Sequence, residues 1–124
     1  MAATVRTMTQ TNDAGLQVNP ISADNTNGDA FTAIQNGKSQ KFIFYNPTGG
    51  SITATLKVQN TTATRVSGIG TVTPADKALA IAASKFGVFE ILASDVIEYL
   101  DANGRVNFTY SGAGLIVVGL AANP

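Results

Sequence analysis

The sequence predicts an all-β protein, a sandwich or barrel built from about seven to nine short strands. Three observations predict this class. Apolar and polar residues alternate with a period of two in several short segments, as they do along a half-buried strand. Turn-forming residues, mainly Gly, Pro, Asn and Asp, separate these segments at intervals of about 8 to 12 residues. The length of 124 residues suits one such domain.

Residues 1–28 are expected to form an extended N-terminal arm, followed by a sandwich domain at 29–124. The arm is polar and rich in Asn, Thr and Asp, with only scattered apolar positions. Val5 and Thr7 on either side of Arg6 permit a short strand. Two interpretations of the arm stay open: a terminal segment that lies on the surface of its own domain, and an arm that becomes ordered on a neighbouring subunit.

The Asn-Gly pair at 36–37 predicts a hairpin between the apolar segments at 31–34 and 41–45. The second of these, "KFIFY", has its two phenylalanines on one face and Ile43 and Tyr45 on the other. A strand that is apolar on both faces belongs in the middle of a packed sheet.

One clear strand and one ambiguous stretch come next. The side chains of segment 51–58 that are predicted to point inward are Ile52, Ala54, Leu56 and Val58. Residues 60–76 have no firm period, and so long a loop in a compact domain is usually functional or mobile. Residues 77–82 fit a strand, but they also fit a helix that would begin at Thr73 and Pro74.

The last third of the chain predicts three further strands. Segment 85–92 is extended and apolar, and segment 115–121 is a continuous apolar run typical of a central strand. Segment 105–111 alternates, and its apolar face holds Val106, Phe108 and Tyr110. Residues 94–100 fit either a short helical turn or the start of a strand.

Charge balance and missing residue types exclude several function classes. Eight basic and eight acidic residues leave no net charge, so no electrostatic field attracts the protein to nucleic acid or an anionic membrane. The absence of Cys and His excludes Ser-His-Asp and Cys-His catalysis and an ordinary zinc site. No apolar run reaches 18 residues, and no apolar signal core opens the chain. We expect a soluble, non-enzymatic protein with no catalytic residues, cofactor or metal, and no nucleic-acid or membrane partner.

Two short motifs imitate nucleotide sites. "NGKS" at 36–39 resembles the end of a phosphate-binding loop, but Thr32 stands where that loop needs glycine. "GAGLIVVG" at 112–119 imitates a dinucleotide fingerprint, but the real motif opens a helix and these residues read as a strand. Both are better explained as turns beside strands.

"DANG" at 101–104 could begin a calcium loop or turn a hairpin. A calcium loop of this kind needs a bidentate acid well downstream, and no Asp or Glu follows Asp101. We predict a turn in which Asp101 caps backbone N–H groups and Gly104 takes a positive φ. The acidic residues are spread singly, so no glycosidase pair is predicted. They are Asp13, Asp24, Asp29, Asp76, Glu90, Asp95, Glu98 and Asp101.

Five segments, taken in order, carry a resemblance to a known family. They are "NGDAF" (27–31), "NGKSQKFIFYN" (36–46), "SITATL" (51–56), "ADKALAIAAS" (75–84) and "YLDANGRVNFTYSG" (99–112). The chain resembles small virion proteins of tailed bacteriophages, the head decoration or cement proteins. That family carries G-D-x-F, N-G-[KR], A-D-[KR] and D-A-x-G-R-V before x-x-x-Y-S. The order and spacing of the motifs give the resemblance its specificity. It departs at 85–100, where family members often carry a Pro-rich segment.

The resemblance implies a strand at 77–82 and a single jelly-roll-like β-sandwich. It implies a structural protein of the virion, made in the bacterial cytoplasm and attached to the outer surface of the capsid. Its partner would be the major capsid protein, and a homo-oligomer, preferably a trimer, would bridge shell subunits through many weak contacts. The expected contacts are the arm at 1–28 and the loop at 60–76. The alternatives are another virion component, such as a head-fibre base, tail or adaptor protein, and a carbohydrate-binding β-sandwich module.

Overall fold

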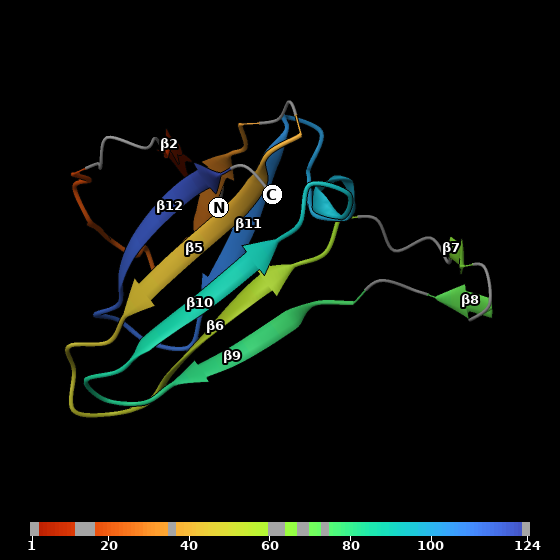
Figure 1. The fold of residues 1–124 in the computed structure, drawn as a ribbon. Helices are drawn as coiled ribbons and strands as arrows, with labels where there is room; N and C mark the ends of the chain where they lie inside the picture. The colour runs from red at the N-terminus through yellow and green to blue at the C-terminus, as the bar shows by residue number, and fades with distance from the viewer. Residues whose placement is uncertain are drawn as a thin grey trace.

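The computed structural model describes residues 3–11, 17–34, 37–59, 64–66, 70–72 and 75–122 (Figure 1). Within these ranges the chain forms β-strands and one short 3-10 helix, η1, and no α-helix, so the predicted all-β class is confirmed. The elements are β1 (Thr4–Thr7), β2 (Thr9–Gln10), β3 (Ile21–Ser22), β4 (Asp29–Thr32), β5 (Ser39–Tyr45), β6 (Ile52–Lys57), β7 (Thr64–Val66), β8 (Gly70–Val72), β9 (Lys77–Ile81), β10 (Phe86–Ile91), η1 (Val96–Glu98), β11 (Arg105–Tyr110) and β12 (Ile116–Ala122).

Most of the strands form a β-sandwich of two mixed sheets (Figure 1). Sheet A has the order β1-β4-β11-β6-β9. Sheet B has the order β10-β5-β12-β2, and β3 also pairs with β12. Parallel pairing occurs where the N-terminal strands join, between β1 and β4 and between β2 and β12, and the other pairs are antiparallel. The two strand orders support the predicted sandwich, and the finer jelly-roll winding stays a prediction.

Four phenylalanine rings form the centre of the core between the sheets. Sheet A contributes Phe31 and Phe108, and sheet B contributes Phe42 and Phe44, each at most 1% exposed. The ring of Phe42 meets those of Phe31 and Phe108 edge to face, with centroids 5.0 and 4.8 Å apart. Burial of each ring stabilises the fold by roughly 1.5–3 kcal/mol before conformational entropy is subtracted. These contacts join the two sheets.

The hairpin predicted around residues 36–37 is wrong, because β4 and β5 lie in different sheets. The chain crosses between the sheets here, and buried Gln40 satisfies the backbone at the crossing. The N–H of Ile34 donates to Oε1 of Gln40 (3.3 Å), and Nε2 of Gln40 donates to the carbonyl of Ile34 (2.6 Å). Residues 35 and 36 lie outside the described ranges.

The described strands of the N-terminal segment lie on the sandwich. The short strand permitted around Arg6 is present as β1, which pairs with β4 across the boundary placed between residues 28 and 29. The side chain of Met8 is 8% exposed and belongs to the core. Ordering of the arm on a neighbouring subunit remains a prediction.

The alternating segment at 51–58 forms β6, in which Ile52, Ala54 and Leu56 are buried as predicted. Val58 follows the end of this strand and is half-buried. Within the predicted loop at 60–76, β7 and β8 pair with each other and stand beyond the ends of β6 and β9 (Figure 1).

Asp76, just before β9, is hydrogen-bonded to the end of β6 and so holds together the two ends of the segment that carries β7 and β8. Its carboxylate accepts hydrogen bonds from Nζ of Lys57 (2.6 Å) and from the N–H of Val58 (2.8 Å). The Lys57 bond, followed by that from Val58, lowers the pKa of Asp76. Segment 77–82 contains β9, so the predicted strand is confirmed and the helical alternative is wrong.

The remaining segments follow the predicted pattern. Segment 85–92 contains β10, and residues 96–98 form η1, the short helical turn that was one of the two alternatives at 94–100. In β11, Val106 and Phe108 are buried and Tyr110 is half-buried. The apolar run at 115–121 forms β12, with β5 on one side and β2 and β3 on the other, which is a central position as predicted.

Candidate functional site

The "DANG" stretch is a turn whose polar groups are occupied by the chain itself. Oδ1 of Asp101 accepts hydrogen bonds from the N–H groups of Asn103 (2.8 Å) and Arg105 (3.0 Å), and Oδ2 accepts one from Nδ2 of Asn107 (2.9 Å). Gly104 has a φ of +74°. Burial raises the pKa of Asp101, but these hydrogen bonds outweigh burial and hold the pKa below its ordinary value. The predicted turn, with its cap and its glycine, is confirmed.

Replacing Gly104 with Val should lower the free energy of unfolding by about 1–2 kcal/mol, because a β-branched residue strongly disfavours the left-handed region. Gly104→Asn should lower the free energy of unfolding by less, since Asn tolerates the left-handed region. Urea denaturation of both variants measures the difference. Calcium or a chelator should leave the Tm unchanged, and a calcium-dependent rise in Tm would contradict the assignment as a turn.

The nucleotide-like motifs and the acidic residues do not come together as a site. The chain after Gly37 and after Gly114, where each nucleotide motif would open a helix, forms the strands at 39–45 and 116–122 instead. Ser39 is fully buried at the start of β5. Across the described part of the chain, no group of three Asp or Glu side chains is placed to hold a metal ion.

The one fully buried carboxylate, among the residues that the structure describes, is that of Asp29 on β4. Its Oδ1 accepts a hydrogen bond in an ion pair with Nε of Arg6 (2.8 Å), and its Oδ2 accepts one from the hydroxyl of Tyr110 (2.7 Å). Burial, followed by the charge of Asp29 and this hydrogen bond, raises the pKa of Tyr110 far above its ordinary value, so the phenol stays protonated. The N–H of Asp24 also donates to Oδ2 of Asp29 (3.2 Å). The cluster therefore fastens β1 and β11 to β4.

The turn before β4 is capped by Asp24. The hydroxyl of Thr4 donates to its Oδ2 (2.6 Å), and the N–H groups of Thr26 and Asn27 donate to its Oδ1 (both 3.1 Å). The Thr4 bond, followed by that from the backbone of Asn27, lowers the pKa of Asp24. The turn ends at Gly28, whose N–H donates to the carbonyl of Asp24 (2.8 Å).

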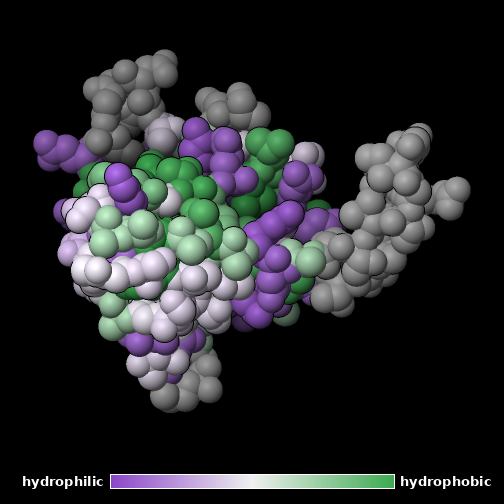
Figure 2. Space-filling view, turned by 90° about the horizontal axis from the view of Figure 1, so that it is seen from below, coloured by the Kyte–Doolittle hydropathy of each residue, from purple (hydrophilic) through white to green (hydrophobic). Residues whose placement is uncertain are grey.

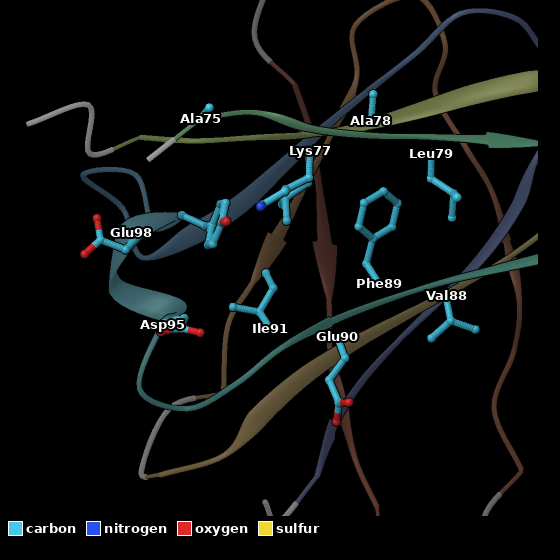
Figure 3. Close-up of a pocket in the computed structure, with 12 residues that line it drawn as sticks. Ala75, Lys77, Ala78, Leu79, Val88, Phe89, Glu90, Ile91, Asp95 and Glu98 are labelled. Carbon is cyan, nitrogen blue, oxygen red and sulfur yellow. The ribbon is translucent and has the colours of Figure 1, made fainter. Parts of the chain in front are cut away.

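A cleft of about 640 Å³ opens on the side of the sandwich where the edge strands β9 and β10 approach each other (Figure 3). The large apolar side chains of its walls are Leu56, Leu79, Phe89 and Ile91, and Val88 borders it from the outer side of β10. The η1 region places Asp95 and Glu98 at one end (Figure 3). Burial, followed by the negative charges of these two residues, raises the pKa of Tyr99. Lys77 and Glu90 also line the cleft, so its apolar walls are combined with one amino group, three carboxyl groups and a phenol. Apolar walls with a few polar groups are typical of binding clefts.

The outward side of sheet B is apolar across three neighbouring strands. The strand register places residues of β10, β5 and β12 side by side in two adjacent rows. Phe86, Tyr45 and Ile116 form one row, Val88, Ile43 and Val118 form the next, and we call these six residues the sheet B face. Phe86 and Val88 are 69% and 57% exposed, and the other four are half-buried. Contiguous apolar patches of this kind are candidate interaction surfaces.

The sheet B face was not singled out from the sequence, although its signal is present there. The runs "KFIFY", "KFGVF" and "LIVVG" are apolar at consecutive positions, which puts apolar side chains on both sides of each strand. For "KFIFY" and "LIVVG" this pattern predicts a central strand that is buried on both sides. The central places of β5 and β12 are confirmed, but the outer side of their sheet is not fully covered by the described residues.

Strongly hydrophilic residues do not form a continuous surface on the side of the molecule shown in Figure 2. Figure 2 shows a side of the molecule that is largely neutral to apolar, with hydrophilic residues gathered in separate patches. Within the described ranges, no helix is long and apolar enough to cross a membrane. No protein-family model, curated protein or solved structure matches the chain.

Proposed function

We propose that this protein is a capsid decoration protein of a tailed bacteriophage. In this role it binds the outer surface of the head and stabilises it by bridging subunits of the major capsid protein. The proposal includes a homo-oligomer, with a trimer favoured, and a jelly-roll-like winding of the sandwich. The protein acts as a structural component of the virion, without catalysis, cofactor or metal.

The observation that carries the proposal is that two of the family-like motifs meet in space. The G-D-x-F motif supplies Asp29 and the x-x-x-Y-S motif supplies Tyr110, and the hydroxyl of Tyr110 donates to the carboxylate of Asp29 at 2.7 Å. The two residues are far apart in the sequence. A part-buried hydrogen bond therefore joins two of the short motifs, which places them in one structural framework. This supports the interpretation that the resemblance is more than a set of chance matches.

The surface chemistry supports the same proposal. Equal numbers of acidic and basic residues limit repulsion when many copies cover a shell side by side. The sheet B face adds an apolar area of the kind that protein contacts use.

Co-sedimentation with purified phage heads tests the proposal. The heads should come from the phage whose genome encodes this protein, grown with this gene deleted. We expect saturable binding at a fixed ratio to the major capsid protein, and a higher temperature at which the heads release their DNA. Purified tails of the same phage are the control.

Two results would replace the proposal. Binding to tails and not to heads would favour the alternative of a tail or adaptor component. No binding to any particle, together with specific hits on a glycan array, would favour a carbohydrate-binding module.

A further inference from the structure

The sheet B face presents exposed apolar side chains on a hydrogen-bonded β-sheet. Its six residues stand on three hydrogen-bonded strands, so their backbone positions are fixed by the sheet. The rings of Phe86 and Tyr45 lie against each other with centroids 4.7 Å apart. A surface held in this way loses little conformational freedom when a partner covers it.

The next row of residues along the same three strands contains one ion pair and has no net charge. Lys41 of β5 and Glu90 of β10 are register partners, with Nζ and Oε2 3.6 Å apart, and Leu120 of β12 completes the row. The face and this bordering row therefore carry no net charge. A partner does not need an opposite field, and the contact should depend on apolar burial rather than on charge.

The size of the face argues against a stable pair of copies joined through it alone. Three strands about 4.8 Å apart, with two rows of side chains about 6.8 Å apart along them, span about 14 by 14 Å, or about 200 Å². Two copies face to face would bury about 400 Å², which is about a quarter of what a stable pairwise complex buries. A contact of this size holds when several copies joined in one oligomer bind a shell of repeated subunits at the same time.

We propose that the sheet B face is the surface that this protein lays against the shell, and that its partner is an uncharged, apolar patch repeated on the shell protein. This inference rests on the proposed function. It places the contact on the outer side of β10, β5 and β12, instead of on the N-terminal arm or the segment at 60–76.

Charged substitutions at the two most exposed positions test the inference. Phe86→Lys and Val88→Lys, made separately, should each weaken binding to the gene-deleted heads by about tenfold or more, as truncation of a central contact residue does. Ile97→Lys is the matched control, because Ile97 is 63% exposed on η1 and outside the face. The control should bind within about twofold of the unmodified protein. Val88→Thr keeps the β-branched shape and replaces the Lys variants in the binding test if they do not fold.

Salt dependence and oligomeric state complete the test. Raising NaCl from about 0.1 to 0.5 M should change the Kd by less than about threefold, because an uncharged contact is not screened. A fall in affinity of tenfold or more over this range would overturn the inference. Light scattering should give the same oligomeric state for Val88→Lys as for the unmodified protein. A loss of subunits in that variant would assign the face to a second copy and would also overturn the inference.

The two proposals fail in different ways. If the unmodified protein binds heads and Phe86→Lys and Val88→Lys bind equally well, the decoration function stands and the sheet B face is not the contact. If the unmodified protein does not bind heads at all, the decoration function is wrong and the inference is overturned with it.

Discussion

Replacing Asp29 with Ala should lower the free energy of unfolding by about 2–4 kcal/mol, somewhat less than the loss of one partner from a fully buried ion pair, because the side chain of Arg6 is 23% exposed. The substitution leaves the guanidinium of Arg6 without its carboxylate and the hydroxyl of Tyr110 without its acceptor. Urea denaturation followed by circular dichroism measures the loss. Tyr110→Phe removes only the hydroxyl and should lower the free energy of unfolding by less, about 1–3 kcal/mol.

An exposed ion pair of similar length is the matched control for Asp29→Ala. Asp76 pairs with Lys57 at 2.6 Å, but these two side chains are 37% and 42% exposed. Asp76→Ala should therefore lose only about 1 kcal/mol or less through the ion pair. The double variant Arg6→Ala/Asp29→Ala should lose less than the sum of its single variants, because the pair is removed together. Strict additivity, or an Asp29 variant no less stable than Asp76→Ala, would contradict the role given to the cluster.

Replacing Gly28 with Ala should have a similarly large effect, about 3 kcal/mol or more. The φ of Gly28 is +80°, and this left-handed conformation alone costs an alanine about 1–2 kcal/mol. A Cβ at this position would also lie 2.6 Å from the carbonyl oxygen of Phe108, a backbone atom of β11 that cannot turn away. Relieving the clash must move β11 or the turn that holds β1, so packing is lost as well. Chemical denaturation gives the loss of stability.

Gly37 separates the two causes. Its φ is +76°, almost the same as that of Gly28, but a Cβ there would meet no atom within 4 Å. Gly37→Ala should therefore show only the backbone term of about 1–2 kcal/mol. Equal losses for the two alanine variants would mean that the approach of Gly28 to β11 contributes nothing.

Strands with one buried face could be predicted from the sequence, and strands that meet across the core could not. In β6 and β11 the apolar residues alternate because one side of each strand is buried, so position and facing are both visible locally. The apolar runs around residues 36–37 are equally compatible with two strands that pair side by side and two that face each other. The structure places Phe31 and Phe42 opposite each other across the core, which no local pattern records.

The candidate site was hidden for a related reason. A strand such as β5, with apolar residues on both sides, has the same sequence whether its outer side is covered by its own chain or left for a partner. The buried cluster was also invisible, because Arg6 and Asp29 are isolated charges in the sequence and only the pairing of β1 with β4 brings them together. The turn at 101–104 could be predicted because all its hydrogen-bonding groups lie within a few residues.

The central place of β12 sets the order in which the protein can be assembled. β12 pairs with β5 along its length and also holds β2 and β3, so Thr9 lies opposite Leu120. While the chain is being synthesised, β5 has β10 as a neighbour but lacks its second one until residues 116–122 are made. β2 and β3 must therefore wait for β12 before they can join sheet B. Folding is therefore dominated by long-range pairing, which is slow, and the apolar edge of β5 remains open to other chains during that interval.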